Sequence, residues 1–387
     1  PQMSPIHFNI VEPAVHACGY NLVILQNDNK AAVNIGLKYV NNDACYPSLM
    51  VVGQIMEAVL SGKYDMDHTA VIMTQTGGGC RASNYIFLLR KALERAGYGY
   101  IPVISLNLAG LENHPGFKLT LPMLHRLFYG IIYGDMLLSL VNQCKPYEKN
   151  KGQTESLADE LTALLANKMQ TEGISFKKVK QNCKMILSRF AEIPRENEEK
   201  VKVGVVGEIY VKYSPLGNNN LEQFLIDEGA EVVVPGLLDF FMYCIVSNIS
   251  DIELYGLHKI RKPVLNFVFG YLQKQQNEII QLMKTDGNFT PPTPIAHTMD
   301  LIKDFMGFGT KMGEGWLLPA EMLELNDEGV HNIVCTQPFG CLPNHICGKG
   351  MMKPLKDAYP DMNIVAVDYD PGATRVNQEN RIKLMLA

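Results

Sequence analysis

Short apolar runs rich in β-branched residues alternate with helix-like segments along most of this chain. In the first part, strand-like runs occupy residues 20–26, 69–75 and 100–107. The segments between them carry apolar residues at i, i+3, i+4 and i+7, which is the spacing of an amphipathic helix. Because parallel strands need long crossover connections, this order predicts a mostly parallel sheet covered by helices.

A second alternation begins near residue 201, after a helical stretch with polar, Lys- and Glu-rich segments. Strand-like runs appear at 201–207, near the end of 219–236, and at 331–340 and 362–370. We therefore predict an α/β protein with two doubly wound, mostly parallel, Rossmann-like lobes. The expected divisions are 1–117 for the first lobe, 118–200 for a helical connection and 201–387 for the second lobe.

The chain opens on PQMSP, which reads like the loop that follows a strand and leads into a helix. A domain that opens on the exit loop of a strand has lost the strand itself. We therefore expect the first lobe to lack its first strand, and the chain to be part of a longer protein.

Composition excludes several classes of protein. A hydrophobic content of 47% with 19% charged residues indicates a globular chain, not a mainly disordered one. The net charge of −5, without a compensating basic cluster, argues against a nucleic-acid surface. No apolar run reaches the length of a membrane span, and no signal peptide is recognisable. We expect a cytoplasmic protein with neither nucleic acid nor a membrane as partner.

The nine cysteines do not form a known short motif. Their odd number does not suit a secreted disulfide framework, and no CxxC is present. This excludes zinc ribbons, thioredoxin-like pairs and ferredoxin-type runs. Four of them stand in helix-like or apolar contexts, where packing is the expected role: Cys18, Cys144, Cys183 and Cys244.

Three of the remaining cysteines lie in loops that follow predicted strands or lead into helices. In open parallel sheets, ligands bind at the carboxyl ends of the strands. The loops expected there are 37–48, 74–81, 207–220 and 335–345. Three of these four carry a cysteine next to glycine, proline or asparagine, which a cysteine buried only for packing does not need.

The glycine loop TQTGGGCR has two competing interpretations. It lacks the lysine of a Walker A loop, and Ala82 replaces the third glycine of a dinucleotide fingerprint, so only backbone amides could cradle a phosphate. The other interpretation is a metal cluster. Gly77, Gly78 and Gly79 would let amides approach its sulfides, and Cys80 would be a thiolate at a helix N-terminus. Arg81 could offset the charge of the cluster.

Six further segments lie in order along nearly the whole chain, at 41–65, 70–93, 206–220, 313–322, 337–346 and 367–386. Together they resemble a known family, the 2-hydroxyacyl-CoA dehydratase-like proteins. The resemblance is closest to the C-terminal region of the long proteins in which ATP-dependent activase modules precede a dehydratase-like part.

The resemblance implies an oxygen-sensitive [4Fe–4S] cluster held by three cysteines, with one iron open to substrate. It matches the ligands to Cys45, Cys80 and Cys341, with Cys335 as the runner-up for the third position. It also implies that an ATP-hydrolysing activase, expected on the same full-length polypeptide, delivers one electron, and that an acyl-CoA thioester is the substrate.

The chain also departs from the family pattern. The known dehydratases pair two different cluster-bearing subunits, whereas one such unit is visible here, so a dimer is one expectation. Relatives with double-cubane clusters reduce small molecules instead of dehydrating thioesters. Their extra cluster needs further cysteines, which Cys335 or Cys347 could supply.

Other polar residues have both a functional and a structural interpretation. Glu208 could accept a proton or cap a helix, and His345 could protonate a leaving hydroxide or serve as a capping or packed residue. The run 218–220 could bind substrate or form a turn. Trp316 could line a channel or belong to the core.

Three function classes therefore remain open. The first is an iron–sulfur enzyme of the dehydratase or low-potential reductase type. The second is a non-catalytic docking lobe of a larger activase complex. The third is a CoA- or phosphate-binding module without a cluster, which would tolerate replacement of its cysteines.

Overall fold

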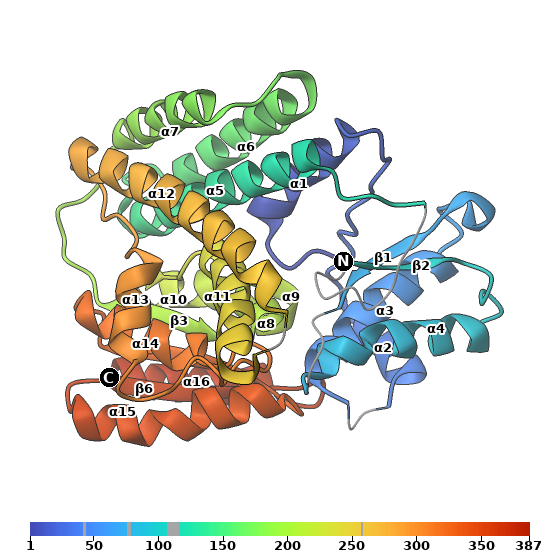
Figure 1. The fold of residues 1–387 in the computed structure, drawn as a ribbon. Coiled ribbons are helices and arrows are strands. Elements are labelled where there is room, and N and C mark those ends of the chain that lie inside the picture. The colour runs from blue at the N-terminus through green and yellow to red at the C-terminus, as the bar shows by residue number, and fades with distance from the viewer. Residues whose placement is uncertain (42–43, 76–78, 107–115, 257) are drawn as a thin grey trace.

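The computed structural model describes residues 1–41, 44–75, 79–106, 116–256 and 258–387. It is a mixed α/β protein with two separate parallel sheets, as the alternation predicts (Figure 1). The smaller sheet pairs β1 (Val71–Thr74) with β2 (Val103–Leu106), in the register Val71 to Val103. The larger sheet has the order β4-β3-β5-β6, and all of its strands are parallel. Its strands are β3 (Lys202–Gly207), β4 (Glu231–Val233), β5 (Asn332–Pro338) and β6 (Asn363–Tyr369).

One predicted strand is wrong. Residues 20–26 belong to no strand of the described chain. The carbonyl of Leu22, which a neighbouring strand would need, instead lies 2.6 Å from Nε2 of His16. An apolar run becomes a strand only where a partner satisfies its backbone groups.

Helices α2 (Lys30–Tyr39), α3 (Tyr46–Leu60) and α4 (Tyr85–Arg95) lie beside the smaller sheet (Figure 1). Helices α2 and α3 approach so closely that a Cβ at Gly53 would lie 2.1 Å from the carbonyl oxygen of Ala32. Helix α3 is buried on two faces. Leu49 and Met56 pack with the smaller sheet, whereas Met50 packs with residues of the larger one.

A layer of helices covers the other end of the molecule (Figure 1). It comprises α1 (Pro5–His16), α5 (Leu121–Cys144), α6 (Gln153–Thr171) and α7 (Phe176–Ala191). Helix α1 packs on α5 and α6. The helical pattern predicted for 118–200 is therefore observed as α5, α6 and α7.

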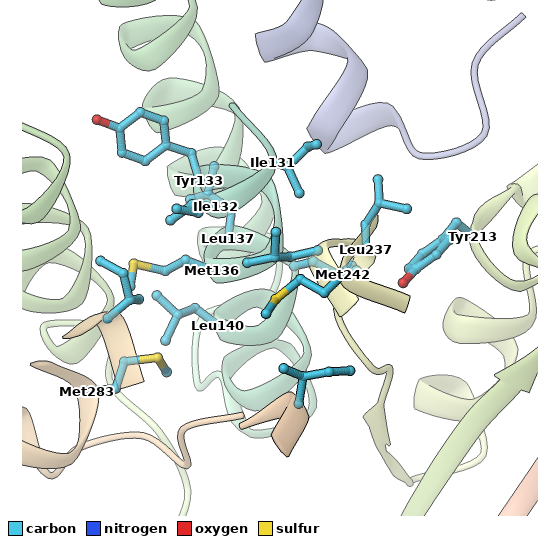
Figure 2. Packing of buried hydrophobic residues seen from close by; sticks show 14 of the residues in the cluster. Ile131, Ile132, Tyr133, Met136, Leu137, Leu140, Tyr213, Leu237, Met242 and Met283 are labelled. Atoms are coloured by element: carbon cyan, nitrogen blue, oxygen red, sulfur yellow. The ribbon is translucent and has the colours of Figure 1, made fainter. Parts of the chain in front are cut away.

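Between β4 and β5 the chain forms three helices, before α14 (Leu317–Asp327), that the sequence pattern did not predict. They are α11 (Leu237–Tyr255), α12 (Lys262–Asp286) and α13 (Ile295–Ile302). Figure 2 shows how α5 packs near α11 and α12, with Met136 and Leu140 near Met242 of α11 and Met283 of α12. This packing joins the helical layer to the larger sheet in one continuous core.

The remaining helices surround the larger sheet. They are α8 (Ile209–Tyr213), α9 (Pro215–Asn218), α10 (Leu221–Asp227), α14 (Leu317–Asp327), α15 (Met352–Ala358) and α16 (Arg375–Leu386). Short 3₁₀ turns lie at Met66–His68, Arg81–Asn84, Lys145–Tyr147, Lys259–Arg261 and Lys349–Met351, and a π-helix lies at Asn344–Gly348. Within the described ranges, no helix has the length and apolar character needed to cross a membrane.

Candidate functional site

The three cysteines of the predicted cluster each stand directly before a helical segment. Cys45 is the N-cap of α3, and Cys80 is the N-cap of the 3₁₀ turn that leads into α4. Cys341 follows β5, and its carbonyl accepts a hydrogen bond from the amide of His345 in the next helical turn. The N-terminal end of a helix carries partial positive charge, which favours a thiolate.

The loops that carry these cysteines touch one another. The amide of Tyr46 donates to the carbonyl of Phe339 at 2.9 Å. A Cβ at Gly340 would lie 3.1 Å from Cα of Cys45, and one at Gly313 would lie 3.0 Å from Cβ of Pro343 and 3.8 Å from Sγ of Cys80. Both glycines have positive φ, so the close approach and the backbone conformation each favour glycine there. Two loops of the small-sheet unit thus meet loops of the larger unit.

All three cysteines are free of disulfides and hold their protons tightly. Burial, together with the charges of the nearby Glu314 and Glu208, raises the pKa of Cys80 to about 12. Burial also raises the pKa of Cys45 and of Cys341, and the charge of Glu208 acts in the same direction on both. A thiolate here needs a compensating cation, so metal binding would release protons from the site.

Two buried carboxyl groups face the same region. Glu208 caps α8, where its Oε2 accepts a hydrogen bond from the amide of Val211 at 2.9 Å. Oε1 of Glu314 accepts from the amide of Ile209 at 3.0 Å. Burial, and then the charge of Glu314, raise the pKa of Glu208 to about 8. Because two like charges this close disfavour joint ionisation, the pair retains a proton near neutral pH.

The structural interpretation of Glu208 as a helix cap is therefore observed, and the same residue also lies near the cysteines. Sequence reasoning missed Glu314. The available signal was its place between Gly313 and Gly315, in a segment that resembles the dehydratase-like family.

Tyr85 is a second missed residue. It begins α4, and its hydroxyl oxygen lies 3.0 Å from Sγ of Cys45. The pKa of Tyr85 is well above its usual value, mainly because of burial and then because of the charge of Cys45. Tyr85 therefore keeps its proton and can donate it in a hydrogen bond.

The predicted glycine loop is described only in part. Gly77 and Gly78 lie outside the described residues. The amide of Gly79 donates to Sδ of Met312 at 3.0 Å, which links this loop to the loop before α14. Arg81 is exposed in the first turn after Cys80.

The remaining candidate ligands and the candidate proton donor, Cys335, Cys347 and His345, differ in their burial and hydrogen bonding. Cys335 lies inside β5 and is fully buried, with Sγ 3.7 Å from Oδ1 of Asn344. Burial, and then the charge of Glu314, raise the pKa of Cys347 to about 11. His345 is exposed, and its Nδ1 lies 2.8 Å from the carbonyl oxygen of Cys341 and 2.7 Å from Nε2 of Gln337.

Two further candidates have mainly structural surroundings. Asn218 accepts from the amide of Leu221, and Asn219 and Asn220 both have φ of +58°, so this run forms a turn. Trp316 is fully buried, and its ring centroid lies 5.0 Å from that of Tyr243. Both observations agree with the structural interpretations.

The donor set of the site favours one class of metal group. Among the residues that the structure describes, no three His, Cys, Asp or Glu side chains are arranged to hold a single metal ion. Three thiols on three adjoining loops instead suit a sulfur-ligated cluster, since a cluster is larger than one ion and takes soft thiolate ligands.

Comparisons with known proteins gave no match for this chain, whether with family models, with curated proteins or with solved structures. The geometry described above and the resemblance of the six sequence segments are therefore the basis for a functional proposal.

Proposed function

We propose that this chain is an iron–sulfur protein of the 2-hydroxyacyl-CoA dehydratase type, or a related low-potential reductase component. Cys45, Cys80 and Cys341 would hold a [4Fe–4S] cluster with one open iron. The observation that carries this proposal is that the loops of three free cysteines adjoin, since Gly340 lies against Cys45 and Gly313 lies against both Pro343 and Cys80. In the same proposal, the two parallel sheets belong to two doubly wound lobes.

When bound, such a cluster supplies one-electron chemistry and a Lewis-acidic iron for the substrate oxygen. The residues of the chain would supply proton transfer and charge compensation. Glu208 and Glu314 would hold a proton beside the site, and in this proposal Glu208 would exchange it with a substrate. His345, on the turn after Cys341, is the proposed donor to a departing hydroxide. Arg81 and the amides of the glycine loop would offset negative charge.

The proposed electron donor is an ATP-hydrolysing activase module, and the proposed substrate is an acyl-CoA thioester. Exposed apolar side chains support the presence of a partner near the site. Phe339, Leu342 and Ile346, which flank Cys341, are 49%, 62% and 55% exposed. Apolar side chains clustered at a surface commonly mark a contact with another protein. The same observation is what a docking lobe without chemistry would show, so the metal content decides between the two.

The test is iron and acid-labile sulfide per chain after anaerobic reconstitution. We expect about four of each in the unmodified chain, and a large loss in Cys45→Ala, Cys80→Ala and Cys341→Ala. Cys335→Ala is the control, since this cysteine is also buried but lies within β5. An unmodified chain that holds no iron would refute the proposal, and loss in the control but not in Cys341→Ala would reassign the third ligand.

A further inference from the structure

Building on the proposed cluster, we infer that Tyr85 is a positioning residue that donates a hydrogen bond to the Cys45 ligand and raises the reduction potential of the site. Its hydroxyl oxygen is 3.0 Å from Sγ of Cys45. Neither the cysteine spacing nor the glycine loop predicts this contact.

The contact joins two of the three ligand loops. Tyr85 is the first residue of α4, and the 3₁₀ turn before it, Arg81–Asn84, begins directly after Cys80. Its side chain crosses from the loop of Cys80 to the loop of Cys45, forty residues earlier in the chain. The segment that positions one ligand therefore also holds the other.

The ring of Tyr85 is fixed by packing. It packs against the core formed between α3, α4 and the smaller sheet, which contains Leu49, Ile86 and Leu89. A side chain anchored in this way loses little additional entropy when its hydroxyl forms a hydrogen bond. The geometry is thus set before any metal is bound.

The chemical consequence follows from the charge of a ligated thiolate. A hydrogen bond to a ligating sulfur withdraws electron density and stabilises the more negative, reduced state. Tyr85 is the donor in this contact, because a sulfur that ligates a metal as a thiolate carries no proton and can only accept. Removal of the hydroxyl should therefore lower the reduction potential and weaken retention of iron.

The experiment compares Tyr85→Phe with the unmodified chain after anaerobic reconstitution. Midpoint potential is measured by a redox titration followed by electron paramagnetic resonance, and iron retention by competition with a chelator. We expect Tyr85→Phe to bind the same number of irons, with a lower potential and 10- to 100-fold weaker retention, on the order found for such supporting residues. Tyr133→Phe is the control, since its hydroxyl bonds Asn182 on the helical layer.

A second substitution keeps the test decisive if the phenylalanine variant folds poorly. Replacement of Tyr85 by 3-fluorotyrosine keeps the ring and makes the hydroxyl a stronger donor, so the potential should rise. An unchanged potential in a folded, iron-loaded variant would overturn the role of Tyr85 while leaving the cluster proposal intact. If no protein, including the unmodified chain, retains iron, both proposals fail together.

Discussion

The two sheet-containing regions of this protein contribute different chemistry to one site. The region around β1 and β2 has four-residue strands and supplies Cys45, Cys80 and Tyr85. In the region around β3 to β6, the strands β3, β5 and β6 have six or seven residues, and this region supplies Cys341 and the carboxyl groups of Glu208 and Glu314. The smaller region therefore supplies two of the three proposed cysteine ligands, and the larger region supplies the third cysteine and both carboxyl groups.

This difference indicates how the site depends on packing. A two-stranded sheet has little stability by itself and relies on its helices. Helix α3 provides the connection, because Met50 packs into the core of the larger sheet and Gln54 accepts a hydrogen bond from Tyr210 of α8 at 2.8 Å. Substitutions at the contact between the two regions should thus destabilise mainly the smaller region. Substitutions of buried charged residues should destabilise the larger region.

The largest expected effect lies in the larger region. Lys212 and Glu321 form a buried ion pair, with Nζ 2.9 Å from Oε1 and side-chain exposures of 5% and 3%. Lys212→Met leaves a buried carboxyl without its partner and should cost about 3–5 kcal/mol of unfolding free energy. Chemical denaturation measures this. The double variant Lys212→Met, Glu321→Leu should recover most of the loss, and a double variant as unstable as the single one would contradict the explanation.

A smaller effect is expected at the junction. Alanine at Gly340 would be unfavourable for two reasons. The backbone has a positive φ of +70°, and the added Cβ would lie 3.1 Å from Cα of Cys45. We expect Gly340→Ala to cost about 2–3 kcal/mol and to reduce retained iron.

Gly62 is a matched control for this change, because its φ is +69° and nothing lies within 4 Å of the added Cβ. Gly62→Ala should cost only ~1 kcal/mol and leave iron binding unchanged. Thermal unfolding and iron content measure both. Equal effects of the two substitutions would mean that the contact between the loops contributes nothing.

The smallest expected effect is a pH dependence. The pKa of Glu208 is about 8 in the folded chain, above the ordinary value of 4.5. Between these values the folded chain holds a proton that the unfolded chain releases, so this group makes stability fall as pH rises from 4.5 to 8.

Glu208→Gln should remove this contribution to the pH dependence of the unfolding free energy. Between pH 5 and pH 8 the metal-free variant should therefore lose less stability than the metal-free unmodified chain, by on the order of 2 kcal/mol. Denaturation curves at several pH values provide the measurement. Glu155→Gln, an exposed carboxyl on α6, should leave the slope unchanged. A parallel pH dependence for Glu208→Gln and the unmodified chain would argue against a protonated Glu208.

Local patterns in the sequence were sufficient to predict the strands of the larger sheet and the placement of Cys45, Cys80 and Cys341 in loops before helices. In β3 and β5 every residue after the first is buried, so apolar residues stand at consecutive positions there. The run at 20–26 is similarly apolar, but no local rule shows that it forms no strand with the described residues.

Glu314 and Tyr85 could not be predicted because their roles arise from contacts between distant segments. Glu314 bonds the backbone of Ile209, which is 105 residues away, and Tyr85 reaches Cys45 over 40 residues. A glutamate between two glycines and a tyrosine at a helix start have ordinary local interpretations. Only the fold brings them to the cysteines.

The central claim is that three cysteines from two regions of the chain hold one cluster with an open iron. Mössbauer spectroscopy of the ⁵⁷Fe-reconstituted chain tests this most directly, because it distinguishes irons by their ligands. The account predicts three irons of one kind and one distinct iron, which alone changes when a small oxygen ligand is added. Four equivalent irons, or none bound, would contradict it.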